Sequence, residues 1–156
     1  MDAGFVNAHL VAVQNVFKTM LSTEIVMGKP ALKTTRMTSA DVTGVIGFAG
    51  DKRGNFSLAF TKETAIYIYK AMVGEDAPSV TPEVIDAIGE ITNIISGQTR
   101  VEIEKLGFHL SAALPTVIVG TNVEVNFITK VPVIALPFSF QAGSVSGKLF
   151  LDFSFE

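Results

Sequence analysis

A carboxylate and an amide stand three residues apart in the segment IDAIGEITNIISG, residues 85–97. Asn93 offers two N–H donors and one carbonyl acceptor, so it can orient a water molecule, although it cannot usefully take the water's proton. Glu90 is an anion that can bind a cationic group. Residues three apart on a helix project from the same side. The pair therefore favours a helper that positions water while a partner supplies the rest of the reactive site.

The segment that carries this pair is predicted to be a long helix. Thr81 provides a capping hydroxyl, and Pro82 suits the first helical position. The helix should run to about Leu106 and stop at Gly107, because glycine readily ends helices.

A helical wheel at about 100° per residue divides this helix into two sides. One narrow polar strip is formed by Asp86, Glu90, Asn93 and Gly97. The opposite, apolar side is formed by Val84, Ala87, Ile88, Ile91, Ile94 and Ile95. The residues flanking the strip are Gly89, Thr92 and Ser96. The isoleucines should therefore be buried while the strip stays exposed.

A solvated helix face without chemistry is the simplest alternative interpretation of this strip. Such faces usually carry Lys, Glu, Gln or Arg, whereas each glycine costs about 1 kcal/mol relative to alanine in a helix interior. Small residues such as Gly89, Ser96 and Gly97 suit a place where another backbone must come close. We therefore predict that Gly89 and Gly97, together with Asp86, contact a partner.

The rest of the chain is predicted to contain two more helices and several strands. The helices are expected over residues 4–22, ended by GKP at 28–30, and over 62–74, between an N-cap at Thr61 and Gly74. A hairpin is expected from residues 42–50 and 55–61, and further strands from 116–120, 123–129, 133–140 and 147–155.

The two halves of the chain look alike at the level of elements. Each is a long helix followed by a strand meander, and GNFSLAF in the first half resembles GKLFLDF in the second. We expect an α+β fold over residues 1–156, with an antiparallel sheet and long helices packed on one face. The β-rich C-terminus is expected to leave an edge strand free, which would be a ready dimerisation surface.

Composition excludes several classes of function. The net charge is −3 without a basic run, which disfavours nucleic acid. The chain lacks cysteine, and neither His9 nor His109 stands at metal-ligand spacing from another candidate. Although the mean hydropathy is +0.44, its apolar stretches are broken by proline and polar residues, so we expect neither a membrane span nor a signal peptide. A cytoplasmic protein is expected.

The pattern D-x3-E-x2-N, formed by Asp86, Glu90 and Asn93 and followed by Pro115, resembles the signature of the CheC/CheX/FliY phosphatases of bacterial chemotaxis. Its sequence context, from EVIDAIGEITNII to ALPTVIVG, is similar to CheX members in particular. The resemblance covers most of the chain and implies a single CheX-like domain. Pro115 is expected to shape the turn that follows it.

The resemblance implies a phosphatase that hydrolyses the aspartyl phosphate of a CheY-like receiver. Asn93 would enter the receiver's active site and orient the attacking water, and Glu90 would pair with the receiver's lysine. The Mg²⁺ ion and the phosphoryl group would belong to the receiver, so no metal or cofactor is expected in this chain. CheX-type proteins also form homodimers through their sheets, which is the assembly expected here.

The first helix is not expected to carry a second site, because neither Gln14 nor Asn15 follows a glutamate by three residues. Two alternatives to a phosphatase remain open from the sequence. One is a non-enzymatic module that binds a receiver or another chemotaxis protein. The other is a dimerisation domain whose polar strip is only solvated.

Overall fold

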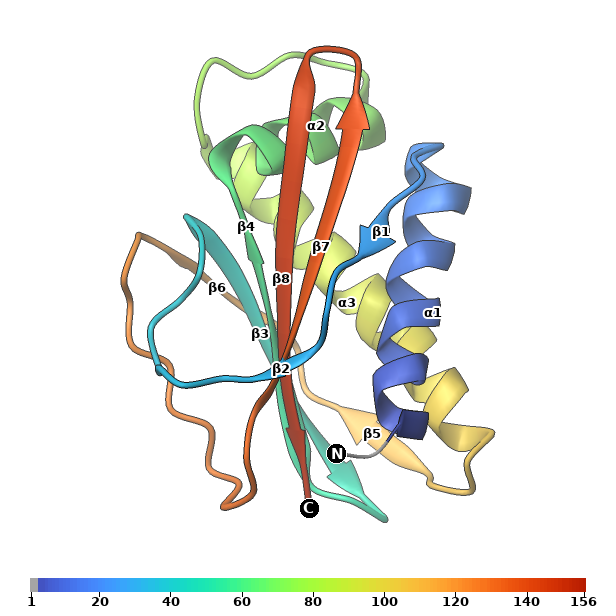
Figure 1. Ribbon diagram of the computed structural model, residues 1–156. Coiled ribbons are helices and arrows are strands. Elements are labelled where there is room, and N and C mark those ends of the chain that lie inside the picture. Colours follow the sequence, from blue (N-terminus) through green and yellow to red (C-terminus); the bar gives the residue numbers. More distant parts are fainter. Residues whose placement is uncertain (1–2) are drawn as a thin grey trace.

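The computed structural model describes residues 3–156, in which helices pack beside a sheet of strands (Figure 1). The helices are α1 (Ala3–Leu21), α2 (Lys62–Val73) and α3 (Pro82–Glu104). The strands are β1 (Val26–Met27), β2 (Ala31–Leu32), β3 (Val42–Gly50), β4 (Gly54–Phe60), β5 (Leu110–Ala112), β6 (Thr116–Val119), β7 (Ile134–Ala142) and β8 (Val145–Phe155).

These strands form one antiparallel sheet in the order β1–β7–β8–β4–β3–β5, in which β2 also pairs with β7 and β6 with β3. In this order, short strands from each half of the chain pair with the long hairpin of the other half. The short strands after α1 lie beside the β7–β8 hairpin, and those after α3 lie beside the β3–β4 hairpin. The two similar segments meet at the centre, where Leu58 of β4 faces Leu151 of β8. This arrangement agrees with the predicted duplication of elements.

The helices pack on one face of the sheet, as predicted for this α+β fold (Figure 1). Side chains alternate along each strand, so every second residue faces the helices. The core-facing residues of the central strands are Val42, Ile46, Phe48, Phe56, Leu58, Phe60, Leu149, Leu151 and Phe153. Helix α3 contacts α1, α2, β3, β5 and β6, and so lies at the centre of this layer. None of the described helices has the length and apolar character that crossing a bilayer requires.

Helix ends mostly follow the predicted caps. The Thr61 hydroxyl accepts the N–H of Thr64, and Gly74 ends α2 in the left-handed region at φ 84°. The Thr81 hydroxyl likewise accepts the N–H of Val84 at the start of α3. The first helix agrees with the predicted residues 4–22 within one residue at each end, but GKP does not end it, because β1 lies between the helix and GKP.

One strand prediction is wrong, and the prediction of a free edge strand is confirmed. Residues 123–129 alternate like a strand, but they form only an isolated bridge through Glu124, because their hydrogen bonds go to the connection between β2 and β3. The predicted free edge in the β-rich C-terminal part exists, but it is formed by β5 and β6 and not by β8, which lies between β4 and β7. The edges are the short strands β1 and β2 on one side and β5 and β6 on the other.

The two histidines lie in opposite environments. His109 is exposed on the surface, with Nδ1 3.4 Å from the Glu104 carboxylate. His9 is completely buried, stacks on Phe153 at a ring-centroid distance of 4.1 Å, and donates from Nδ1 to the carbonyl of Phe5. Burial lowers the pKa of His9 from 6.5 to about 4, although the bond to Phe5 opposes the shift.

The stability of the fold should therefore depend on pH through His9. Its contribution is complete above the unfolded pKa of 6.5 and is lost as the pH falls toward the folded pKa of about 4. The shift corresponds to about 3 kcal/mol over that window. Urea denaturation between about pH 4 and pH 8 should show a smaller loss of stability for His9→Phe than for the parent chain. Parallel pH profiles for His9→Phe and the parent would contradict this assignment.

Candidate functional site

The polar strip of α3 faces solvent, as the helical wheel predicts. Asp86, Glu90 and Asn93 are exposed, and Gly97 is half-buried. The opposite side is buried and consists of Val84, Ala87, Ile88, Ile91 and Ile95, with Ile94 half-buried beside it. The carboxylate and the amide therefore project outward from a helix whose other side is fixed in the core.

The prediction for the flanks of the strip is partly wrong. Thr92 and Ser96 do not lie at the surface but are completely buried. The Thr92 hydroxyl donates to the carbonyl of Ile88, and the Ser96 hydroxyl donates to the carbonyl of Asn93, each over 2.7 Å. These small side chains therefore serve packing within the chain rather than contact with a partner, and Ser96 bonds to the backbone of Asn93 itself.

Strand β3 comes unusually close to α3 at Gly44. A Cβ atom added to Gly44 would lie 2.8 Å from Cγ2 and 2.9 Å from Cβ of Thr92, and closer still to its hydroxyl. Because Thr92 is buried, it has no free space into which it can move. The absence of a side chain at Gly44 therefore allows α3 to sit against the sheet, and Asn93 follows Thr92 directly.

The substitution Gly44→Ala should destabilise the fold by about 1–3 kcal/mol, the usual cost of overpacking. The matched control is Gly47→Ala in the same strand, where an added Cβ meets nothing within 4 Å. Urea denaturation should show a clear loss for the first variant and little change for the second. Adding Thr92→Ala to Gly44→Ala should destabilise by less than the sum of the two single variants, because it removes the nearest atoms. Additive losses would contradict the proposed clash.

Gly97 in the strip and Gly89 beside it are not required by contacts inside the chain. A Cβ added to Gly97 would meet nothing within 4 Å, and one added to Gly89 would make an ordinary contact of 3.4 Å with Val117. Both residues lie within the α-helix rather than in the left-handed region. They therefore leave open space at the surface of α3, next to Glu90 and Asn93.

Pro115 lies in a break of an edge strand and not in a turn, which corrects the prediction for it. Strand β5 pairs with the end of β3, and β6 pairs with its beginning. Between them, the N–H of Ala113 donates to the carbonyl of Gly47 over 3.0 Å. Because proline has no N–H, it cannot continue the ladder. Pro115 thus separates β5 from β6 along the flank of α3.

Leu114 stands out at this break, because 85% of its surface is exposed. Gly44 lies under Thr92 and pairs with Val117, whereas Gly50 pairs with Leu110 near the end of α3. Leu114 therefore lies at the sheet edge between β5 and β6, two strands that both contact α3. Sequence reasoning missed this residue; the only available signal was an aliphatic side chain directly before Pro115.

The arrangement limits the chemistry that the chain can supply by itself. Within residues 3–156, no group of three His, Cys, Asp or Glu side chains is placed to hold a metal ion. On the other side of the strip, the Asn15 amide donates to Gln98 over 3.3 Å, so this amide is engaged with α3. The strip offers one amide that can orient water and one carboxylate that can bind a cation.

Comparison with known proteins shows what the chain is similar to. The family model described as chemotaxis phosphatase CheX matches residues 42–139. The CheY-P phosphatase CheX of Thermotoga maritima is 31% identical over 137 residues, which cover 85% of this chain and 88% of that protein. This chain belongs to the CheX family. The resemblance found in the sequence is thereby confirmed.

Solved structures agree with this membership. The crystal structure of the chemotaxis protein CheX from Desulfovibrio desulfuricans is 36% identical and has a TM-score of 0.87, covering 97% of this chain and 99% of that chain. A chain of the CheX–CheY–BeF3–Mg²⁺ complex from Borrelia burgdorferi has a TM-score of 0.78 at 24% identity, covering 97% of both chains. This second likeness shows the shared fold.

Proposed function

We propose that this chain is a phosphatase that accelerates hydrolysis of the aspartyl phosphate of a CheY-like receiver. The observation that carries the proposal is the exposed Glu90–Asn93 pair on α3 in a member of the CheX family. The Thermotoga maritima relative is named for the same reaction, and the Borrelia burgdorferi neighbour is in complex with CheY.

Asn93 enters the receiver's active site and orients a water molecule in line with the phosphoryl group. Glu90 pairs with the receiver's lysine and fixes the approach of α3. The receiver holds the Mg²⁺ ion and the phosphoryl group. Phosphoryl transfer depends mainly on alignment and on charge stabilisation, so a water-positioning amide is a sufficient contribution. The chain therefore needs no nucleophile or metal of its own for this reaction.

The placement of α3 supports this mechanism. The apolar side of the helix is buried against the sheet, and the close approach of Gly44 to Thr92 limits sliding. The Ser96 hydroxyl also binds the carbonyl of Asn93. An amide on such a rigid support loses little freedom when the receiver binds, which favours accurate positioning of water.

The receiver docks on the exposed strip and its flanks. Asp86 extends the strip toward the start of α3, and Gly89 and Gly97 give clearance for the receiver's loops. Leu114 adds an apolar contact from the sheet edge beside α3. The two glycines support this proposal because no contact within the chain explains them.

Two further features belong to the proposal. The chain acts in the cytoplasm, which the absence of cysteine supports. It forms a homodimer through sheet edges, for which the outer side of β1 and β2 is a candidate, since these strands pair only with β7 among the described residues. Val26 of β1 and Leu32 of β2 are also exposed.

The variant Asn93→Ala should lower the acceleration of receiver dephosphorylation by about 100-fold, the scale of a lost positioning contact. Glu90→Gln should mainly weaken binding, because it removes the charge that pairs with the receiver's lysine. The matched control is Asn7→Ala near the start of α1, which removes an exposed amide that is not part of the strip. The measurement is the lifetime of the phosphorylated receiver at several phosphatase concentrations.

Full activity of Asn93→Ala would contradict the mechanism. Tight binding of the parent chain to phosphorylated receiver without any change in the receiver's phosphate lifetime would favour the alternative, a non-enzymatic binding module.

The variant Gly97→Ala should change stability and activity in opposite directions. Alanine should stabilise the helix by about 1 kcal/mol, because it is the better helix former and meets no atom within the chain. The same methyl group should raise KM for the phosphorylated receiver if the open space admits a receiver loop. Urea denaturation and steady-state kinetics measure the two effects. A stabilised variant with unchanged KM would show that the receiver does not use this space.

A further inference from the structure

The face of the sheet opposite the helices is covered by two connecting segments, residues 33–38 and 123–133 (Figure 1). The N–H of Val125 donates to the carbonyl of Arg36 over 2.8 Å. The N–H of Thr38 donates to the carbonyl of Val123, also over 2.8 Å. We call these two paired segments the cover. They are the connections that precede β3 and β7, so the two halves of the chain supply one segment each.

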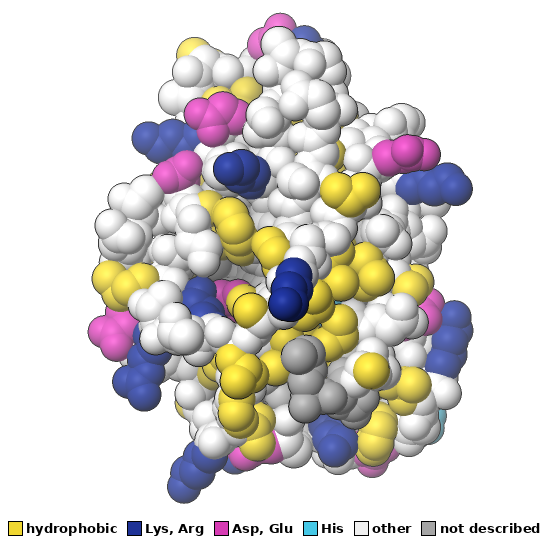
Figure 2. Space-filling model, viewed as in Figure 1, with side chains coloured by type: hydrophobic (Ala, Val, Ile, Leu, Met, Phe, Trp, Pro, Cys, Tyr) yellow, Lys and Arg dark blue, Asp and Glu magenta, His cyan; other side chains and the backbone are white. Residues whose placement is uncertain are grey.

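A cavity of about 820 Å³ lies beneath the cover. Figure 2 shows it as a hollow on this face, with charged side chains inside. Its floor includes Thr43 of β3, Ser57 of β4 and Asp152 of β8, which are side chains from the middle of the sheet. The volume falls within the range of small-molecule sites. The cavity therefore has the size of a ligand site on the face away from Asn93.

The floor is polar although it is buried. Thr43 is 1% exposed, and Ser57 and Asp152 are each 5% exposed. The Thr43 hydroxyl has no hydrogen-bond partner among the described residues. An unpaired buried hydroxyl lowers stability, so a polar group in such a position needs an explanation. A ligand that displaces the atoms covering this hydroxyl would supply the missing partner.

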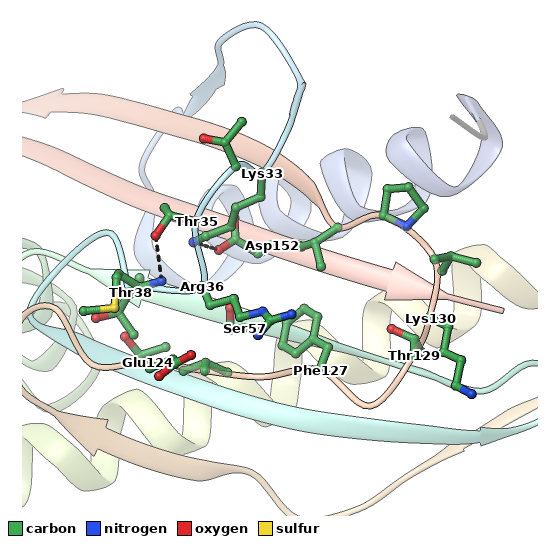
Figure 3. A pocket seen from close by; sticks show the side chains of 18 residues that line it. Lys33, Thr35, Arg36, Thr38, Ser57, Glu124, Phe127, Thr129, Lys130 and Asp152 are labelled. Carbon is green, nitrogen blue, oxygen red and sulfur yellow. Dashed lines mark hydrogen bonds and ion pairs between the residues drawn. The ribbon is translucent and has the colours of Figure 1, made fainter.

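The cavity lining holds two cationic groups that form no ion pair within residues 3–156, Arg36 and Lys130, and it also holds the carboxylate of Glu124. Lys33 forms an ion pair with Asp152, and both side chains are mostly buried. Burial raises the pKa of Asp152, and the bond to Lys33 opposes that shift. Figure 3 shows the Arg36 side chain lying within the cavity, between Ser57 and Phe127.

We propose that this cavity binds a small anionic metabolite through Arg36, Asp152 and Thr43. The planar guanidinium of Arg36 donates to a phosphate or carboxylate group, which it matches with two parallel bonds. Asp152 accepts from a hydroxyl or amino group of the same ligand, and the Thr43 hydroxyl bonds to its polar body. The proposal concerns the opposite face of the sheet and does not depend on the phosphatase reaction.

A second copy of the chain is the competing occupant of the cavity. The floor argues against it, because β3, β4 and β8 each pair with strands on both sides. Their backbone groups are already bonded in the sheet, so an inserted peptide could not add to it as a strand. Recognition must come from side chains, which here are hydroxyl and charged groups. Such a floor suits a small polar ligand better than a protein segment.

Thermal unfolding with four probes, two organic phosphates and two carboxylates, tests the proposal: adenosine monophosphate, glucose 6-phosphate, citrate and glutamate. At least one should raise Tm in a saturable way, because it binds only the folded chain. A response confined to the phosphates or to the carboxylates identifies the anionic group. Arg36→Gln should weaken Kd by about tenfold or more, the scale of a lost charge-assisted bond. Lys18→Gln on α1 removes the same charge and should leave Kd unchanged.

The variant Thr43→Val separates binding from folding. Removing an unpaired hydroxyl should leave the unliganded chain at least as stable as the parent, while binding of the active probe weakens. Three results would each overturn the proposal. They are the absence of saturable binding by all four probes, equal weakening in Arg36→Gln and Lys18→Gln, and a Tm that rises with protein concentration while no probe changes it.

Discussion

The contact between Thr92 of α3 and Gly44 of β3 sets the distance between the central helix and the sheet. Because α3 touches both other helices and three strands, this distance fixes the whole helical layer. The same helical turn that buries Thr92 directs Asn93 to solvent, and Ser96 bonds to the Asn93 carbonyl. Burial on one side of a turn therefore determines the position of the amide on the other.

The elements that were predicted correctly carry their own local signals. Helix α2 has its cap at Thr61 and its stop at Gly74, and α3 begins at Thr81. The strands β1 and β2 have two residues each, too few to show a period. Residues 123–129 do show a strand period, yet their partner is a loop. Pairing depends on which segments meet in space, and no local pattern contains that information.

The sequence predicted the site only in terms of which side of the helix each residue occupies. A wheel separates the exposed Glu90 and Asn93 from the buried isoleucines, but it does not show what covers the flanks. Thr92 and Ser96 are buried because neighbouring elements close over them. Leu114 was missed because it comes from another part of the chain, and only the pairing of β5 and β6 with β3 places it at the sheet edge near α3.

An edge strand with free backbone groups is a template on which other chains can grow a continuous sheet, and long flat edges promote aggregation. Here Pro115 divides the edge into β5, with three residues, and β6, with four. Neither piece offers a long uninterrupted row of donors and acceptors. The flank of α3 can thus stay open to a folded partner without exposing a surface on which unfolded chains readily assemble.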